Sequence, residues 1–228
     1  MTKINLFADS NQPQARIAPI LLWYKTNTTV MNTNQKNPLL ILVIVFLLPF
    51  AALAQTTYSI KEYKMTVQGS SSLHEWESDV TKAEARANVT IQDKQLKEIK
   101  DVTVKIPVTG IKSTKGKTMD NKTYEAFDSG KNPNIQYKLT SAKITASGAE
   151  YTIVANGNLT MAGTTKPVEL TAKAKVLANG DVQITGLRKL NMKDFNMVPP
   201  TAVMGTIKVG EEVTVNFNIT LTNSSSNL

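Results

Sequence analysis

The chain has 228 residues, a net charge of +8 at neutral pH and no cysteine. The lack of cysteine excludes disulfides and thiol chemistry. Aromatic residues make up only 6% of the chain and the lysines are scattered, which argues against a nucleic-acid partner and favours a solvated basic surface. A basic surface is also compatible with transient contact with an anionic membrane surface.

An export signal is predicted near the N-terminus. Lys36 precedes an apolar run from Leu39 to Phe50, and Ala52-Leu53-Ala54 then supplies an A-x-A cleavage site. The run is shorter than the roughly 20 apolar residues of a membrane-spanning helix. We therefore predict a signal peptide over residues 31–54, cleaved after Ala54, and a periplasmic or secreted product.

This signal divides the chain into four parts. Residues 1–30 show no periodicity, and we interpret them as an over-extended start with Met31 as the initiator; a long region ahead of the apolar run is the alternative. Residues 55–222 form one predicted domain that is long enough to bury a core. Residues 223–228 are expected to form a flexible tail.

Apolar and polar residues alternate through most of the predicted domain, which is the pattern of half-buried strands. The segment from Val213 to Thr222 is the clearest example, and Asn179-Gly180 is the strongest hairpin signal. Many short strands joined by tight turns predict an antiparallel sandwich or barrel. The expected strands are Tyr58–Gln68, Ser71–Val80, Ala83–Ile91, Val102–Val108, Gln136–Ala146, Tyr151–Met161, Val168–Val176, Val182–Met192 and Val213–Thr222.

One segment departs from this alternation. Met119, Thr123 and Phe127 follow one another at helical spacing, which predicts a short helix near residues 119–127, capped by a Thr or Asp near its start. In an all-β chain such a helix commonly covers one end of a barrel, or else it forms a crossover between strands.

Alanines are frequent on the predicted apolar strand faces. A barrel of about eight strands has an interior that side chains can just fill or that can hold one small ligand. Small inward residues favour a cavity, whereas the alternative is that they let two sheet faces approach closely. The residues concerned are Ala83, Ala85, Ala87, Ala172 and Ala174.

His74 is the only histidine of the chain, and Trp76 lies two residues beyond it. Residues two apart in a strand share a face, so both rings should point the same way, whereas Glu75, Glu77 and Asp79 should point oppositely. A metal site is therefore not expected here, because these carboxylates cannot close on an ion with His74. No G-x-S-x-G motif accompanies the histidine, and a catalytic role is not expected.

Several stretches together resemble the YceI-like, polyisoprenoid-binding family, over roughly Thr57 to Leu221. The most specific are the run from Leu159 to Leu170 (L-T-M-A-G-T-T-K-P-V-E-L) and the K-D-F element at Lys193–Phe195. The stretch Ser71–Trp76 and the segments Met119–Ser129 and Asn132–Ile135 add to the resemblance. The chain differs at Asn196, where family members usually carry glycine, so contacts near that loop are expected to differ.

The resemblance implies an all-β fold, an eight-stranded antiparallel lipocalin-like barrel, exported to the periplasm and enclosing a long isoprenoid chain. Together with the absence of a catalytic or metal-binding pattern around His74, this predicts a lipid carrier without enzymatic activity, cofactor or metal. The partner would be a long-chain isoprenoid lipid such as an isoprenoid quinone, with homodimer formation left open. Candidate ligand-binding residues are His74, Trp76, Met119, Tyr124, Phe127 and Phe195, for each of which ordinary core packing is the alternative.

Two other functions compete with this interpretation. One is a ligandless stress-response or interaction module, which predicts a continuously packed barrel interior. The other is a hydrolase or isomerase that uses His74, which predicts that His74→Ala abolishes turnover in a folded protein.

Overall fold

The computed structural model describes residues 56–224. The predicted signal peptide at residues 31–54, residues 1–30 and residues 225–228 lie outside this range. Within it, the helices are all too short or too polar to cross a bilayer.

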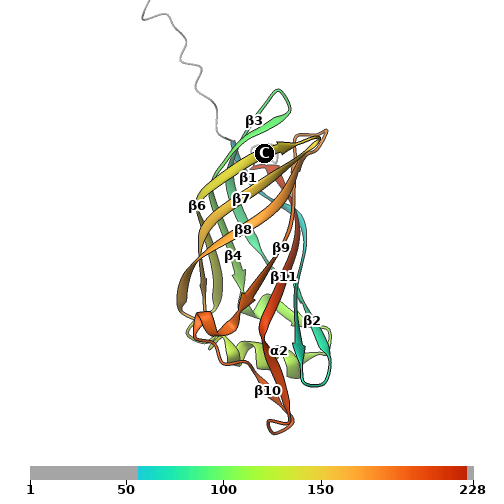
Figure 1. Ribbon diagram of the computed structural model, residues 1–228, viewed down its shortest axis with the longest axis vertical. Coiled ribbons are helices and arrows are strands. Elements are labelled where there is room, and N and C mark those ends of the chain that lie inside the picture. The colour runs from blue at the N-terminus through green and yellow to red at the C-terminus, as the bar shows by residue number, and fades with distance from the viewer. Residues whose placement is uncertain (1–55, 225–228) are drawn as a thin grey trace, which may run out of the picture. The chain divides into compact units, whose positions relative to one another are not determined.

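Eight antiparallel strands close into a barrel, because β11 pairs with β9 on one side and with β1 on the other (Figure 1). The predicted eight-stranded all-β barrel is thus confirmed. Asn223, the first residue of the expected tail, is the last residue of β11 and pairs with Tyr58. Around the barrel the strands are β1 (Thr56–Ser71), β3 (Glu84–Gln92), β4 (Gln95–Pro107), β6 (Asn134–Ser147), β7 (Glu150–Met161), β8 (Thr164–Val176), β9 (Val182–Asn191) and β11 (Ile207–Asn223).

One end of the barrel is filled by side chains. Two tyrosine hydroxyls lie here: that of Tyr58 donates to the Gly180 carbonyl at 3.2 Å, and that of Tyr151 accepts from the Leu96 amide at 3.1 Å. Because their polar ends are paired, both rings can be placed among apolar neighbours without an unsatisfied group. The buried cluster at this end consists of Tyr58, Ala87, Val89, Leu96, Ile99, Ile153, Ala174, Val182 and Leu221.

At the other end the barrel widens beside β1. β1 pairs with β3 through Thr56–Ser59 but with β2 (Glu75–Val80) through Thr66–Ser70. The chain bends between β2 and β3, where the Thr81 amide and hydroxyl both donate to the Gly110 carbonyl at 2.8 and 2.9 Å. The 3-10 turn η1 (Val108–Gly110) then leads into β5 (Ile111–Ser113), which extends the wall outward beside β2.

A second widening lies between β8 and β9. Their pairing ends at Ala172 and Gly186, so the remainder of each strand has no partner on that side within the described sheet. The 3-10 helix η2 (Met192–Phe195) packs beside this opening, and Phe195 is only 2% exposed there. Closure at this point therefore depends on side chains, because no strand hydrogen bonds span the gap.

The helix α2 (Lys117–Ala126) lies across the wide end, close to the residues predicted to be helical (Figure 1). The expected cap by Thr or Asp is wrong, because Gly116 occupies the N-cap position without a side-chain bond. Asp120 is instead committed to β5: it accepts from the Ser113 amide at 2.7 Å and pairs with Lys112 at 3.4 Å. These contacts fasten α2 to the barrel wall.

The stretch around His74 is a hairpin turn. The predicted strand Ser71–Val80 is therefore wrong at its start. β1 continues to Ser71, and β2 begins only at Glu75. The Ser71 hydroxyl donates to the His74 carbonyl at 2.7 Å and accepts from the His74 amide at 3.1 Å. A hydroxyl that satisfies both backbone groups favours a local turn over strand pairing.

The hairpin between β8 and β9 is held by a buried carboxylate. Asp181 is 5% exposed, accepts from Lys61 and Asn179 at 2.8 Å each, and has a pKa held below its usual value, mainly by the hydrogen bond from Lys61. Because the pKa of Asp181 is lower in the folded than in the unfolded chain, this carboxylate stabilises the barrel at pH values above its unfolded-state pKa of about 4. This contribution disappears as the pH falls through the folded-state pKa.

We therefore expect Asp181→Asn to lower the melting temperature at pH 7 and to lose most of that effect near pH 2. Thermal melts of both proteins across this range measure the difference. A constant difference between them at every pH would contradict the assignment. Asp93→Asn, on an exposed turn, serves as the matched control with little expected effect.

Candidate functional site

Two adjoining cavities occupy the barrel interior. The inner cavity has a volume of about 230 Å³, and the outer cavity at the α2 end has about 410 Å³. Six residues line both cavities, so the apolar surface continues from one to the other. They are Val67, Ile111, Ile135, Met161, Leu190 and Val215.

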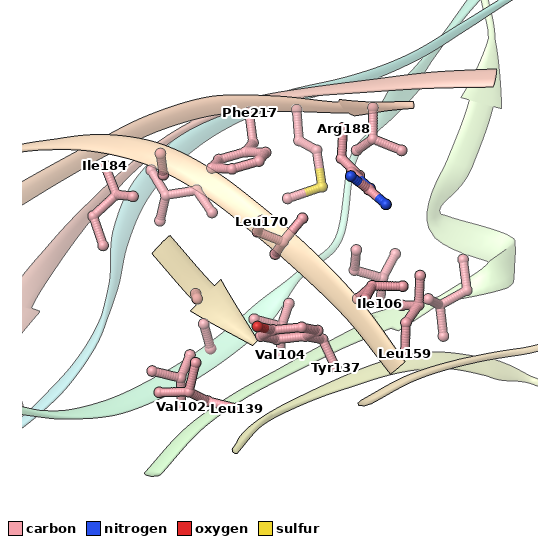
Figure 2. Close-up of a pocket in the computed structure, with 18 of the residues that line it drawn as sticks. Val102, Val104, Ile106, Tyr137, Leu139, Leu159, Leu170, Ile184, Arg188 and Phe217 are labelled. Atoms are coloured by element: carbon pink, nitrogen blue, oxygen red, sulfur yellow. The ribbon is translucent and has the colours of Figure 1, made fainter. Parts of the chain in front are cut away.

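The inner cavity is lined almost wholly by apolar side chains of the barrel strands, as Figure 2 shows. Tyr137 and Arg188 are the exceptions among its lining residues. Four alanines contribute to the wall, and their short side chains leave the space open. They are Ala85, Ala142, Ala155 and Ala172. Ala87 and Ala174, which were predicted to do the same, belong to the packed end instead.

The outer cavity is bounded by α2, the β1–β2 turn and the segment after η2. Its lining mixes apolar side chains such as Trp76 and Met192 with hydroxyls and two lysines, Lys115 and Lys122. Val203 also lines it and lies between β10 (Thr201–Ala202) and β11. The site thus changes from apolar in the barrel to mixed at the α2 end.

Four of the six predicted ligand-binding residues come together at the outer cavity. His74 and Trp76 line it from the β1–β2 hairpin, and Met119 and Phe127 line it from α2 and its end. Glu75, Glu77 and Asp79 do not line it, as the two-residue repeat predicts. The Trp76 indole nitrogen donates to the Ser70 carbonyl at 3.0 Å, which fixes the ring against the wall.

The other two predicted residues lie outside both linings. The Tyr124 hydroxyl accepts from Lys112 of β5 at 2.5 Å and donates to the carbonyl of Thr109, in η1, at 3.1 Å. Phe195 is buried in the cluster that closes the β8–β9 opening, beside Val168 and Leu190. Tyr124 therefore anchors the helix, and Phe195 packs the wall.

His74 has local backbone contacts. Its Nδ1 lies 2.9 Å from the Glu75 carbonyl oxygen, and the nearby Ser71 hydroxyl is committed to the His74 backbone. No group of three or more His, Asp or Glu side chains in the described part of the chain is arranged to hold a metal ion. The arrangement lines a cavity mouth and offers no described base–nucleophile pair at this histidine.

Comparison with known proteins decides the family. A model of the YceI-like domain matches residues 52–221. The chain belongs to the YceI-like family. Among solved structures, BcnA of Burkholderia cenocepacia is 18% identical, covering 70% of this chain and 96% of its own, with a TM-score of 0.52.

A second solved structure resembles this YceI-like chain at 9% identity. It is described as a polyisoprenoid-binding domain from Saccharophagus degradans implicated in plant cell wall breakdown. The match covers 74% of this chain and 99% of the neighbour's chain, with a TM-score of 0.56. A search of curated proteins found no match. At these identities the two structures support the fold alone.

Asn196, the departure from the family pattern, takes a left-handed backbone conformation. It follows η2 with φ 56° and ψ 23°, a left-handed conformation that glycine adopts freely and that asparagine tolerates best among other residues. Its side-chain amide donates to the Thr164 hydroxyl at 3.1 Å. In this YceI-like chain Asn196 therefore fits the turn that follows η2, and its side chain hydrogen-bonds to β8.

Three wall glycines of the YceI-like barrel lie against aromatic rings. A Cβ atom at Gly157 would fall 2.5 Å from the Tyr137 ring, and one at Gly186 would fall 2.6 Å from Phe217. Gly69 is covered in the same way by Trp76. These glycines let the rings lie flat against the wall, so that the rings take up less of the interior.

Arg188 and Tyr137 are not among the ligand-binding residues predicted from the sequence. Both occupy inward positions in alternating strands, between apolar residues such as Ile184 and Leu190 or Ile135 and Leu139. A polar residue on the apolar side of an alternating segment is the signal that could have found them.

Proposed function

We propose that this YceI-like protein is an exported, non-enzymatic carrier that encloses a long apolar lipid, of the polyisoprenoid or isoprenoid-quinone type, in its barrel. The observation that carries the proposal is the apolar inner cavity that continues into a larger cavity at the α2 end. The apolar segment and cleavage site at residues 39–54 support export.

The energetics suit an apolar chain. Burial contributes about 0.8 kcal/mol for each methylene group, so affinity should rise roughly fourfold per added carbon until the interior is full. The polar groups at the α2 end leave room for a more polar portion of a ligand. The Saccharophagus degradans neighbour, named for polyisoprenoid binding, supports an isoprenoid chain as the cargo.

The cavities also weigh against the ligandless alternative. A filled barrel would leave no interior cavity, whereas here an apolar cavity of about 230 Å³ lies beyond the packed cluster that contains Tyr58. Alanines and flat-lying rings keep the middle of the barrel open. A module without cargo would gain stability by filling this space.

Trp76 provides a direct probe of binding, because it lines the outer cavity. In a Trp23→Phe background it is the only tryptophan of the chain. We expect geranylgeraniol to change Trp76 emission saturably in delipidated protein, and farnesol to bind more weakly. Absence of any saturable change with either alcohol, together with no bound lipid in the purified protein, would rule out the carrier function.

We further propose that cargo exchange occurs at a membrane surface through the α2 end. The turn between β10 and β11 exposes Val203 (67%) and Met204 (107%), both with left-handed φ, at positions where Asn-Gly would be the usual choice. Leu73 is also exposed, and the Ser72 amide donates to the Lys208 carbonyl at 2.8 Å, which joins the two turns. Exposed apolar tips at a cavity mouth suit insertion into a lipid interface.

Met204→Asp should slow transfer of a fluorescent lipid between vesicles about tenfold, because burying a carboxylate at the interface is unfavourable. Equilibrium affinity for lipid in solution should be unchanged. Leu187→Asp, at an exposed position on the outer face of β9, is the matched control and should transfer at the wild-type rate. Equal rates for Met204→Asp and wild type would contradict docking by this tip.

A further inference from the structure

We propose that Arg188, with Tyr137, receives the acidic head group of a long-chain amphiphile inside the barrel. This inference rests on the proposed carrier function and specifies its ligand class: a chain that ends in a carboxylate or a phosphate. In this proposal the head group of the amphiphile lies inside the barrel. The alternative location is the outer cavity beside α2, which is lined by Lys115 and Lys122.

Arg188 lies on the inward side of β9. Along this strand Ile184, Arg188 and Leu190 all line the inner cavity, whereas the neighbouring Leu187 is exposed and Lys189 pairs with Glu212 at 3.0 Å. Arg188 stands opposite Val215, which also faces the interior. The guanidinium is thus directed by strand alternation to the apolar side of the wall.

Among the described residues, the Arg188 side chain has no hydrogen-bond or ion-pair partner. Its Nε is buried without a hydrogen bond, and none of the ion pairs or side-chain hydrogen bonds found within residues 56–224 includes it. No aspartate or glutamate lines the inner cavity. Arg188 is half-buried, and an unpaired charge against apolar walls is unfavourable, so the complementary charge is expected to come with the ligand.

Tyr137 supplies a second donor to the same cavity. Its hydroxyl is also buried without a partner, and burial raises the pKa of the phenol, which keeps it protonated at neutral pH. Figure 2 shows the Arg188 guanidinium and the Tyr137 hydroxyl within a shell of aliphatic side chains. Both groups donate, so both call for an acceptor, and the charge on Arg188 favours an anionic one.

The two residues lie near the junction of the cavities. Ile135 and Leu190, each two positions along the strand from Tyr137 or Arg188, line both cavities. A head group here has apolar space on either side for its chain. Carboxylate and phosphate both match the planar donor set of arginine, and the experiment separates them.

The test compares hexadecanoic acid, hexadecyl phosphate and hexadecanol, which share a chain, for binding to the delipidated full-length protein. We expect at least a tenfold preference of the wild type for one or both acids over the alcohol. Arg188→Met should abolish this preference while retaining alcohol binding, and should raise the melting temperature of the ligand-free protein. Tyr137→Phe should weaken acid binding severalfold and leave alcohol binding unchanged.

Arg86→Met, at an exposed position on β3, is the matched control and should keep the preference. Equal wild-type binding of acids and alcohol, or a preference that survives Arg188→Met, would overturn the inference while leaving the carrier function intact. Loss of the preference for acids in the Lys115→Gln, Lys122→Gln double variant would also overturn the inference. The head group would then lie at the cavity mouth beside α2. Failure of all three probes to bind would count against both proposals.

Discussion

Replacing Ala155 with phenylalanine should abolish lipid binding and leave the barrel folded. Ala155 pairs across the strands with Ala142, and both line the inner cavity. The new ring would occupy the space that the lipid chain needs. We expect a loss of affinity of at least about 100-fold, or roughly 2.7 kcal/mol, with an unfolding free energy lowered by no more than about 1 kcal/mol because the ring enters an existing cavity.

Thr171→Phe is the matched control, since this exposed residue of β8 lies on the outer face between inward-facing Leu170 and Ala172. It adds a ring of similar size outside the barrel and should keep wild-type affinity. Measuring both variants by Trp76 emission and thermal melts separates occlusion from misfolding. Wild-type affinity in a folded Ala155→Phe protein would show that the lipid does not use the inner cavity.

Gly157→Ala should destabilise the barrel strongly. The new Cβ would approach the Tyr137 ring to 2.5 Å, and the ring could escape only into the cavity. We expect a loss of about 2–3 kcal/mol in the free energy of unfolding, the usual scale for overpacking. Chemical denaturation measures it.

The loss of unfolding free energy caused by Gly157→Ala should depend on the Tyr137 ring. In a Tyr137→Leu background, Gly157→Ala should cost at least about 1 kcal/mol less, the size of coupling expected for residues in contact. Gly130→Ala is the control glycine, because nothing lies within 4 Å of a Cβ atom there. Additive effects of Gly157→Ala and Tyr137→Leu would contradict the proposed packing.

Much of the fold follows from the alternation of apolar and polar residues. The two-residue repeat predicts the extent of β7 to within one residue, whereas β11 begins at Ile207, well before the predicted start at Val213. The repeat also places Trp76 and the neighbouring carboxylates on opposite faces. The first half of β4 was missed because the turn before it, Asp93-Lys94, takes left-handed φ values of 51° and 60° without a glycine to mark it. Such turns have little sequence signal.

The site was only partly predictable, for physical reasons that differ between residues. Helical spacing correctly groups Met119 with Phe127 on the cavity side, whereas Tyr124, one position from Thr123, turns to β5. Phe195 closes a gap between β8 and β9 that no local pattern reveals. Arg188 was overlooked because basic residues normally lie on the solvated face of a strand.

Solvent extraction of the natively purified full-length protein, followed by mass spectrometry, would establish whether the barrel carries a lipid. We expect a long-chain lipid bound in near-stoichiometric amount, and its loss from Ala155→Phe but not from Thr171→Phe. A wild-type protein that carries no lipid and takes up neither isoprenoid alcohols nor long-chain acids would contradict the carrier function.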